Sequence, residues 1–135
     1  ALMLAYAGVV RLQWRSFIQH ELPIKTFIPA PGQGAIAVEC HNRHHSLIKR
    51  LQRINHTPTA MCIATEKAMA RLLNASCGSP FGCHAQINGD TMSLSLYWEA
   101  SPSQIFCDHL TLPLNQHAQL PSQMLKKLQN KGLSL

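Results

Sequence analysis

The feature that most constrains the fold is an alternating segment in the second half of the chain. Over Thr91–Ala100, Met, Leu, Leu and Trp alternate with Ser, Ser, Tyr and Glu. Such alternation places apolar side chains on one face of a β-strand and polar side chains on the other. Asn88–Asp90 and Ser101–Ser103 are turn sequences, and the strand-like segments Cys83–Ile87 and Gln104–Leu112 lie beyond them. The sequence therefore predicts a three-stranded antiparallel sheet.

Helical patterns flank the predicted sheet. Thr59 or Thr57 is expected to cap a long helix that runs through Ala75. Its expected core stripe comprises Met61, Ala64, Ala68, Leu72 and Ala75, widened by Ile63, Met69 and Leu73. A last helix over Pro121–Asn130 directs Met124, Leu125 and Leu128 inward, and Gly132 stops it. The second half thus predicts an α+β domain in which helices cover a small sheet.

The first half is less regular. Tyr6–Gln13 is expected to be a short helix, and Ala1–Ala5 and Ala35–Cys40 read as buried strands. The segment His41–Ile54 has the pattern of an amphipathic helix with a solvated basic face. Asn55–Pro58 interrupts these patterns and is a candidate domain boundary.

The turn that contains Cys77 is the main candidate site. Cys77 stands among small residues on the connection from the long helix to the first strand, and Gly78 and Gly82 after it free the backbone. A thiol held in this way suits a covalent anchor, although a Cys–His pair with His84 stays open. The other apolar-run cysteines, Cys40, Cys62 and Cys107, are expected to be small buried side chains. No spacing typical of a zinc site is present, so no metal is expected.

A second candidate site is the Pro-Ala-Pro-Gly-Gln-Gly loop over Pro29–Gly34. Its glycines allow the backbone to approach a ligand, and the Gln33 amide offers both hydrogen-bond donors and acceptors. A tight loop without a ligand is the alternative. The loop is not a phosphate-binding P-loop, because no Gly-Lys-Ser/Thr follows.

Charge and cysteine content restrict the class of protein. The 135 residues carry a formal net charge of +6 and five cysteines. The odd, irregular cysteine count predicts reduced thiols and a cytoplasmic location. The modest positive charge fits carboxylate ligands as well as nucleic acid. No stretch is long and apolar enough to span a membrane, and the start within an apolar run, without Met, suggests a piece of a longer chain.

Three motifs, in this order, resemble the porphobilinogen deaminase (hydroxymethylbilane synthase) family. They are Leu4–Leu12 (LAYAGVVRL), Ile28–Cys40 (IPAPGQGAIAVEC) and Glu66–Gly82 (EKAMARLLNASCGSPFG). The resemblance implies a C-terminal fragment of a three-domain α/β enzyme whose first two domains resemble periplasmic binding proteins. Residues 1–28 would end domain 2, residues 29–54 would be a returning strand and helix of domain 1, and residues 55–135 would form the C-terminal α+β domain.

The resemblance also implies a function. The family joins four porphobilinogen molecules head to tail, with loss of ammonia, to give hydroxymethylbilane for tetrapyrrole (haem) biosynthesis. The matching positions imply a dipyrromethane cofactor bound to Cys77 as a thioether, with Gln33 and Gly34 along the cofactor and Arg11 on substrate carboxylates. The implied partners are porphobilinogen, oligopyrrole intermediates and the N-terminal half of the same enzyme. Neither nucleic acid nor a membrane is implied, and the complete enzyme is expected to be a monomer.

Some observations keep other functions open. The family's catalytic aspartate lies in the N-terminal half, so no residue here is assigned as catalytic and the fragment alone is expected to be inactive. Lys67, Ala75 and Ser79 depart from the family's usual residues, so an inactive paralogue is one alternative. The other is a basic domain that binds ligands or nucleic acid through the His41–His56 region, although that region lacks the interleaved aromatic side chains.

Overall fold

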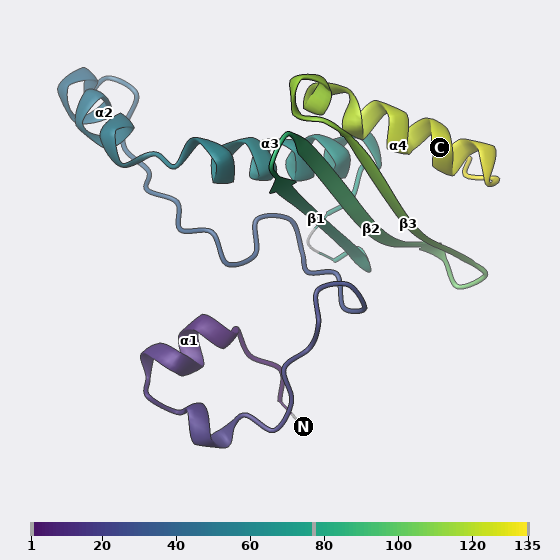
Figure 1. Ribbon diagram of the computed structural model, residues 1–135, viewed down its shortest axis with the longest axis horizontal. Coiled ribbons are helices and arrows are strands. Elements are labelled where there is room, and N and C mark those ends of the chain that lie inside the picture. The colour runs from purple at the N-terminus through teal and green to yellow at the C-terminus, as the bar shows by residue number, and fades with distance from the viewer. Residues whose placement is uncertain (1, 77, 135) are drawn as a thin grey trace.

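A three-stranded antiparallel sheet forms the centre of the second half of the chain (Figure 1). The computed structural model describes residues 2–76 and 78–134. Strands β1 (Phe81–Asn88), β2 (Thr91–Ser101) and β3 (Gln104–Pro113) pair in the order β1-β2-β3. Both connections are tight turns, and Gly89 has a positive φ of 56° in the first. The predicted sheet and its turns are confirmed.

Two helices cover one face of this sheet. Helix α3 (Thr57–Leu72) packs mainly on β1, and helix α4 (Leu120–Asn130), which follows the 3₁₀ helix η3 (Leu114–Gln119), packs on β3 (Figure 1). All five elements contribute apolar side chains to one core. Its buried members are Met69, Leu73, Cys83, Ala85, Met92, Leu94, Leu96, Phe106, Leu120, Met124, Leu128 and Leu133. The α+β domain is therefore as the sequence predicts.

Helix α3 differs from prediction in its buried face and in both ends. Met69 and, just beyond the helix, Leu73 are buried in the core, and the predicted Met61 and Ala75 pack against it, whereas Ala64 and Leu72 are exposed. The helix begins at Thr57 with His56 as N-cap, and no side chain caps it. It ends at Leu72 because Asn74 adopts a left-handed conformation with φ of 50°. The bonds from Ala75 N–H to Ala70 O and from Asn74 N–H to Arg71 O close the helix as a Schellman motif.

Helix α4 ends as the sequence predicts. Gly132 has a φ of 95°, and its N–H donates to Gln129 O at 3.0 Å. The next N–H, that of Leu133, donates to Leu128 O at 3.1 Å, which completes a second Schellman motif. Both Leu128 and Leu133 are buried in the core, so this helix end also contributes apolar packing.

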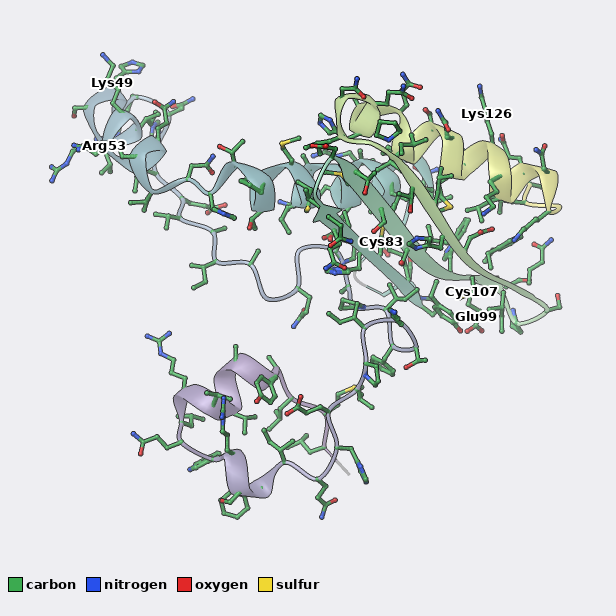
Figure 2. The ribbon with its side chains drawn as sticks, in the orientation of Figure 1. Lys49, Arg53, Cys83, Glu99, Cys107 and Lys126 are labelled. Atoms are coloured by element: carbon green, nitrogen blue, oxygen red, sulfur yellow. The ribbon has the colours of Figure 1, made fainter. Side chains whose placement is uncertain are left out.

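The first half of the chain forms short helices that lie mostly outside the core. These are α1 (Tyr6–Arg11), the 3₁₀ helix η1 (Arg15–Phe17), α2 (His45–Leu51) and the 3₁₀ helix η2 (Gln52–Ile54). Figure 1 shows α1 apart from the sheet and α2 beyond the start of α3. In this half, Lys49 and Arg53 project outward from the α2–η2 region (Figure 2). The expected basic helix is thus present, although it is shorter than His41–Ile54.

The two strands expected in the first half are not formed. Residues 2–5 and 35–40 belong to no strand, and Ile36 is 91% exposed. A strand needs a neighbour to bind its backbone N–H and C=O groups. Within the described residues neither segment has such a neighbour, so their apolar side chains stay exposed.

The cysteines also depart from expectation. Cys107 is exposed and Cys40 and Cys62 are partly exposed, whereas Cys83 is fully buried in the core. Cys107 lies on the polar face of the sheet that no helix covers, because its neighbours Phe106 and Asp108 point toward the helices. In the part of the chain that the structure describes, no helix is long and apolar enough to cross a membrane.

Candidate functional site

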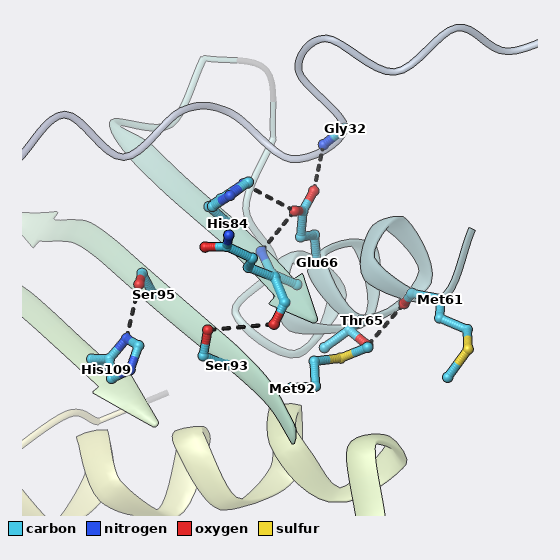
Figure 3. A network of polar contacts seen from close by, with 11 residues as sticks. Gly32, Met61, Thr65, Glu66, His84, Met92, Ser93, Ser95 and His109 are labelled. Carbon is cyan, nitrogen blue, oxygen red and sulfur yellow. Dashed lines mark hydrogen bonds and ion pairs between the residues drawn. The ribbon is translucent and has the colours of Figure 1, made fainter. Parts of the chain in front are cut away.

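A buried carboxylate joins the Pro29–Gly34 loop to helix α3 and strand β1. Glu66 lies on α3 and is only 3% exposed. One of its oxygens, Oε2, accepts a hydrogen bond from Gly32 N–H at 2.7 Å, and the other, Oε1, accepts one from Ala85 N–H at 2.8 Å (Figure 3). The imidazole Nδ1 of His84 lies 3.6 Å from Oε1. Three separate parts of the chain therefore meet at this side chain.

The loop continues along the free edge of β1. The N–H of Cys83 donates to Pro29 O at 2.8 Å, so the first residue of the loop pairs with the strand through one backbone hydrogen bond. Gly82 makes this approach possible, because a Cβ atom at that position would collide with the carbonyl oxygen of Ile28. Together with the Glu66 bond, these contacts fix residues 28–32 against β1.

The exposed end of the loop presents backbone with little side-chain cover. Gly32 and Gly34 have positive φ values of 75° and 83°. A Cβ atom on Gly34 would meet no atom within 4 Å, and Gln33 beside it is exposed. This open strip has room for a flat group, and the Gln33 amide can donate to or accept from such a group.

The predicted anchor, Cys77, lies outside the described residues, but the residues around it are placed. Ser76 N–H donates to the Ser79 hydroxyl at 3.0 Å, and Ser79 N–H donates to Ser76 O at 3.0 Å. Glu99 N–H of β2 donates to Pro80 O at 3.1 Å, which ties the end of this connection to the sheet. The connection between α3 and β1 is therefore held at both ends, at Asn74 and at Pro80.

Arg11 is the one predicted site residue that the structure leaves away from this region. It is the last residue of α1 and is exposed, and Figure 1 shows α1 at a distance from the sheet and α3. Gln33 and Gly34, by contrast, lie on the loop that contacts β1. The structure thus holds the loop against α3 and β1 and leaves Arg11 apart from them.

Two thiols near Glu66, the buried Cys83 and the partly exposed Cys62, are unsuited to nucleophilic chemistry. Burial, and then the nearby Glu66 carboxylate, raise the pKa of Cys83 far above its ordinary range. The same two causes raise the pKa of Cys62, and the backbone N–H of Ile87 partly opposes them. A thiol reacts as its thiolate, so Cys62 and Cys83 are held in the unreactive form. Among the described residues, no cluster of three or more His, Cys, Asp or Glu is arranged to bind a metal ion.

Glu66 is the functional-site residue that sequence reasoning missed. The sequence offered one signal, because Glu66 precedes Met69 and Leu73 at helical spacings of three and seven residues. A carboxylate on the buried stripe of a helix needs hydrogen-bond donors, and backbone N–H groups of a strand edge and a glycine loop supply them here.

A broad open groove of about 840 Å³ lies between residues 35–40, helix α2 and one side of α3. Its lining is mainly apolar and includes Ile36, Val38, Ile48 and Ile63. Lys67 and Arg71 of α3 also line it. The groove coincides with the segment for which a strand was expected.

Comparison with known proteins identifies the family. Residues 1–49 match the family model described as "Porphobilinogen deaminase, dipyromethane cofactor binding domain". The chain is 33% identical over 134 residues, 98% of its length, to the porphobilinogen deaminase of Nitrosomonas europaea. It is 40% identical over 94 and 95 residues, 70% of its length, to those of Dichelobacter nodosus and Methylobacillus flagellatus.

Each of these similarities covers only part of the relative's own length. The aligned parts cover 43% of the Nitrosomonas protein, 30% of the Dichelobacter protein and 31% of the Methylobacillus protein. The chain belongs to the porphobilinogen deaminase family, and it spans less than half the length of these relatives.

Proposed function

We propose that the full-length protein carrying this chain is a hydroxymethylbilane synthase, a transferase that joins four porphobilinogen molecules head to tail with loss of ammonia. The observation that supports this most is the meeting of two motifs at the edge of β1. The Pro29–Gly34 loop is bonded to β1 directly and through Glu66, and the connection that contains Cys77 leads into the same strand. A cofactor attached to that connection would lie in the same region as the exposed backbone of the loop at Gln33 and Gly34.

Cys77 is the proposed attachment point of the dipyrromethane cofactor. Loss of ammonia from the aminomethyl group of porphobilinogen leaves an electrophilic methylene carbon. The sulfur of Cys77 forms a bond to this carbon and releases the thiol proton, which gives a stable thioether. Because the carbon is strongly electrophilic, the thiol needs no strongly lowered pKa.

The other proposed site residues bind rather than react. Gln33 is proposed to hydrogen-bond the bound group, and the open space at Gly34, where a Cβ atom would meet no atom within 4 Å, supports a close approach of that group. Arg11 is proposed to bind a carboxylate of the substrate, since its guanidinium can donate two parallel hydrogen bonds. When bound, dipyrromethane supplies the pyrrole on which the chain of four is built.

The remaining parts of the proposal concern the rest of the protein. The apolar surfaces of residues 1–28 and 29–54 would be covered by two further domains, and Arg11 would reach the site only in that assembly. Exposed Ile36 and Val38, 91% and 60% accessible, support this because an apolar segment predicted to be a strand needs a partner strand. The free thiols of Cys40, Cys62, Cys83 and Cys107 support a cytoplasmic location, and we expect the full-length protein to be a monomer.

The test compares two forms of the protein. The full-length protein, incubated with porphobilinogen, should release ammonia and form hydroxymethylbilane, measured by mass spectrometry. The 135-residue chain should form none, because the family's catalytic aspartate lies outside it and a positioned acid–base group typically contributes about 10²–10⁴-fold in rate. Absence of product from the full-length protein would contradict the proposed activity. Turnover by the 135-residue chain alone would contradict the claim that the catalytic aspartate lies outside it.

A further inference from the structure

We propose that Glu66 is a positioning residue, which holds the Pro29–Gly34 loop at a fixed place relative to the connection that contains Cys77. The role of the loop in binding the cofactor rests on the proposed function. The attachment of the loop through Glu66, called the tether below, consists of two hydrogen bonds. One carboxylate oxygen accepts the N–H of Gly32 in the loop at 2.7 Å, and the other accepts the N–H of Ala85 in β1 at 2.8 Å.

The burial of Glu66 makes these two bonds necessary. The side chain is about 4% exposed, so water cannot replace a lost partner. Burial of an ionised carboxylate is costly unless hydrogen bonds compensate it, and bonds to a charged acceptor are stronger than bonds between neutral groups. The loop N–H of Gly32 therefore contributes to satisfying a charge that α3 carries into the interior.

Helix α3 fixes the loop in two further ways. Ile63, one turn before Glu66, lies beneath Gly32, where its side-chain atoms are 3.9 Å from the site of a Cβ atom. The last residue of α3, Leu72, comes six positions after Glu66, which corresponds to about 9 Å of helical rise. Since the Cys77 connection follows directly, one rigid helix sets the distance between loop and connection.

Substitution of Glu66 by Gln tests whether the side chain acts through its two hydrogen bonds or only fills space. The amide has nearly the same size, but only its oxygen accepts hydrogen bonds, and its NH₂ group would face the second backbone N–H. One of the two amides, Gly32 or Ala85, must lose its partner. The amide keeps the volume of the carboxylate, so the apolar packing of the core should be little affected.

The experiment uses the full-length protein and two matched variants, Glu66→Gln and Glu99→Gln. Glu99 is a partly exposed residue on β2 (Figure 2) whose side chain makes no hydrogen bond in the described part of the chain. Hydrogen exchange followed by mass spectrometry should show that the segment 29–36 or the segment 83–87 exchanges about 10-fold faster in Glu66→Gln. The core segment 92–96 should exchange as in the wild type, and Glu99→Gln should change none of these segments.

A second readout links the tether to the site. When porphobilinogen is added to the cofactor-free protein, the intact mass should gain the dipyrromethane adduct about 10-fold more slowly in Glu66→Gln, with the same final mass. If exchange in segments 29–36 and 83–87 is unchanged in Glu66→Gln, or if every segment loses protection alike, the positioning role is wrong. If the loop is released but the wild type forms no adduct, the tether stands and the proposed function is the part that fails.

Discussion

The two halves of the chain differ in how their apolar residues are used. Residues 57–134 bury a continuous core between one sheet face and two helices. Among the described residues up to 56, only Val9 is buried, and large apolar side chains such as Leu2, Phe17 and Ile36 are exposed. Both halves are rich in apolar residues, so composition does not account for the difference. The second half finds its packing partners within the chain, and the first half does not.

The contacts between the halves are few and specific. They include the Cys83–Pro29 and Gly32–Glu66 hydrogen bonds and the close approach of Ile28 to Gly82. These contacts fix the Pro29–Gly34 loop and leave the segments on either side exposed. The candidate site is therefore the place where the less packed half is held by the well-packed half.

Hydrogen exchange on the 135-residue chain should show the largest contrast between the halves. Amides of the central strand, such as Leu94 and Leu96, should exchange about 10³-fold or more slowly than those of Ile36 and Val38, because only global unfolding exposes them. In the full-length protein the segment 35–40 should become protected if it is a strand of another domain. Equal protection of both segments in the 135-residue chain would contradict the comparison.

Core truncation should separate the halves by stability. Leu94 is fully buried, so Leu94→Ala should lower the free energy of unfolding by about 3–5 kcal/mol. The matched change Ile36→Ala, at a 91% exposed side chain, should alter it by less than about 0.5 kcal/mol. Urea unfolding followed by circular dichroism measures both variants. Similar losses in the two variants would show that Ile36 belongs to the core.

Sequence reasoning succeeded where contacts are local. The hairpins around Thr91–Ser101 pair residues close in sequence, so alternation and turn residues were sufficient to predict the sheet and the α+β domain. The strand over residues 35–40 was predicted from apolar character alone, and strand formation depends on a neighbour that the chain does not supply. The stripe on α3 was misplaced because Thr65 and Glu66, which are buried, were not treated as core positions.

The candidate site was predicted in part for the same reason. The loop around Gln33 and the small residues around Cys77 were visible as local motifs. The contacts of residues 28–32 with α3 and β1 depend on Glu66 and Gly82, which lie far from the loop in sequence, and no local pattern indicates which residues they contact.

A methyl group at Gly82 should break the contact between the halves. In Gly82→Ala the new Cβ would collide with the carbonyl oxygen of Ile28, so the segment 28–32 must move and the Cys83–Pro29 bond should weaken. We expect a loss of about 1–3 kcal/mol in urea unfolding. Gly8→Ala is the control, because a Cβ there meets no atom within 4 Å. An unaffected Gly82→Ala variant would mean that the loop is not held at this edge.

The smallest expected effect concerns an ion-pair cluster within the packed half. Asp108 lies 2.6 Å from both Lys127 and Lys131 of the α4 end. Burial raises the pKa of Asp108, but hydrogen bonds from Lys127, Lys131 and His109 N–H outweigh burial and hold the pKa below its usual range. A depressed pKa in the folded state stabilises the fold above the unfolded pKa of about 3.9, and this contribution is lost as the pH falls through the folded value.

Asp108→Asn should therefore lower stability by about 1–2 kcal/mol at pH 7 and by less at pH 2. The exposed Asp90 provides the control variant Asp90→Asn. Urea unfolding at several pH values measures the difference. A loss that is the same at pH 2 and pH 7 would show that packing, rather than charge, explains the effect of Asp108.

The central claim is that the connection between the packed helix and the packed sheet carries a covalent cofactor on Cys77. The most direct measurement is the intact mass of the full-length protein, as wild type, Cys77→Ser and Cys107→Ser, each exposed to porphobilinogen. Cys107→Ser is the matched control because Cys107 is an exposed thiol of the same domain, whereas Cys83 is buried in the core. The wild type and Cys107→Ser should carry the mass of a dipyrromethane group and Cys77→Ser should lack it. Persistence of the adduct in Cys77→Ser, or its absence from the wild type, would contradict the account.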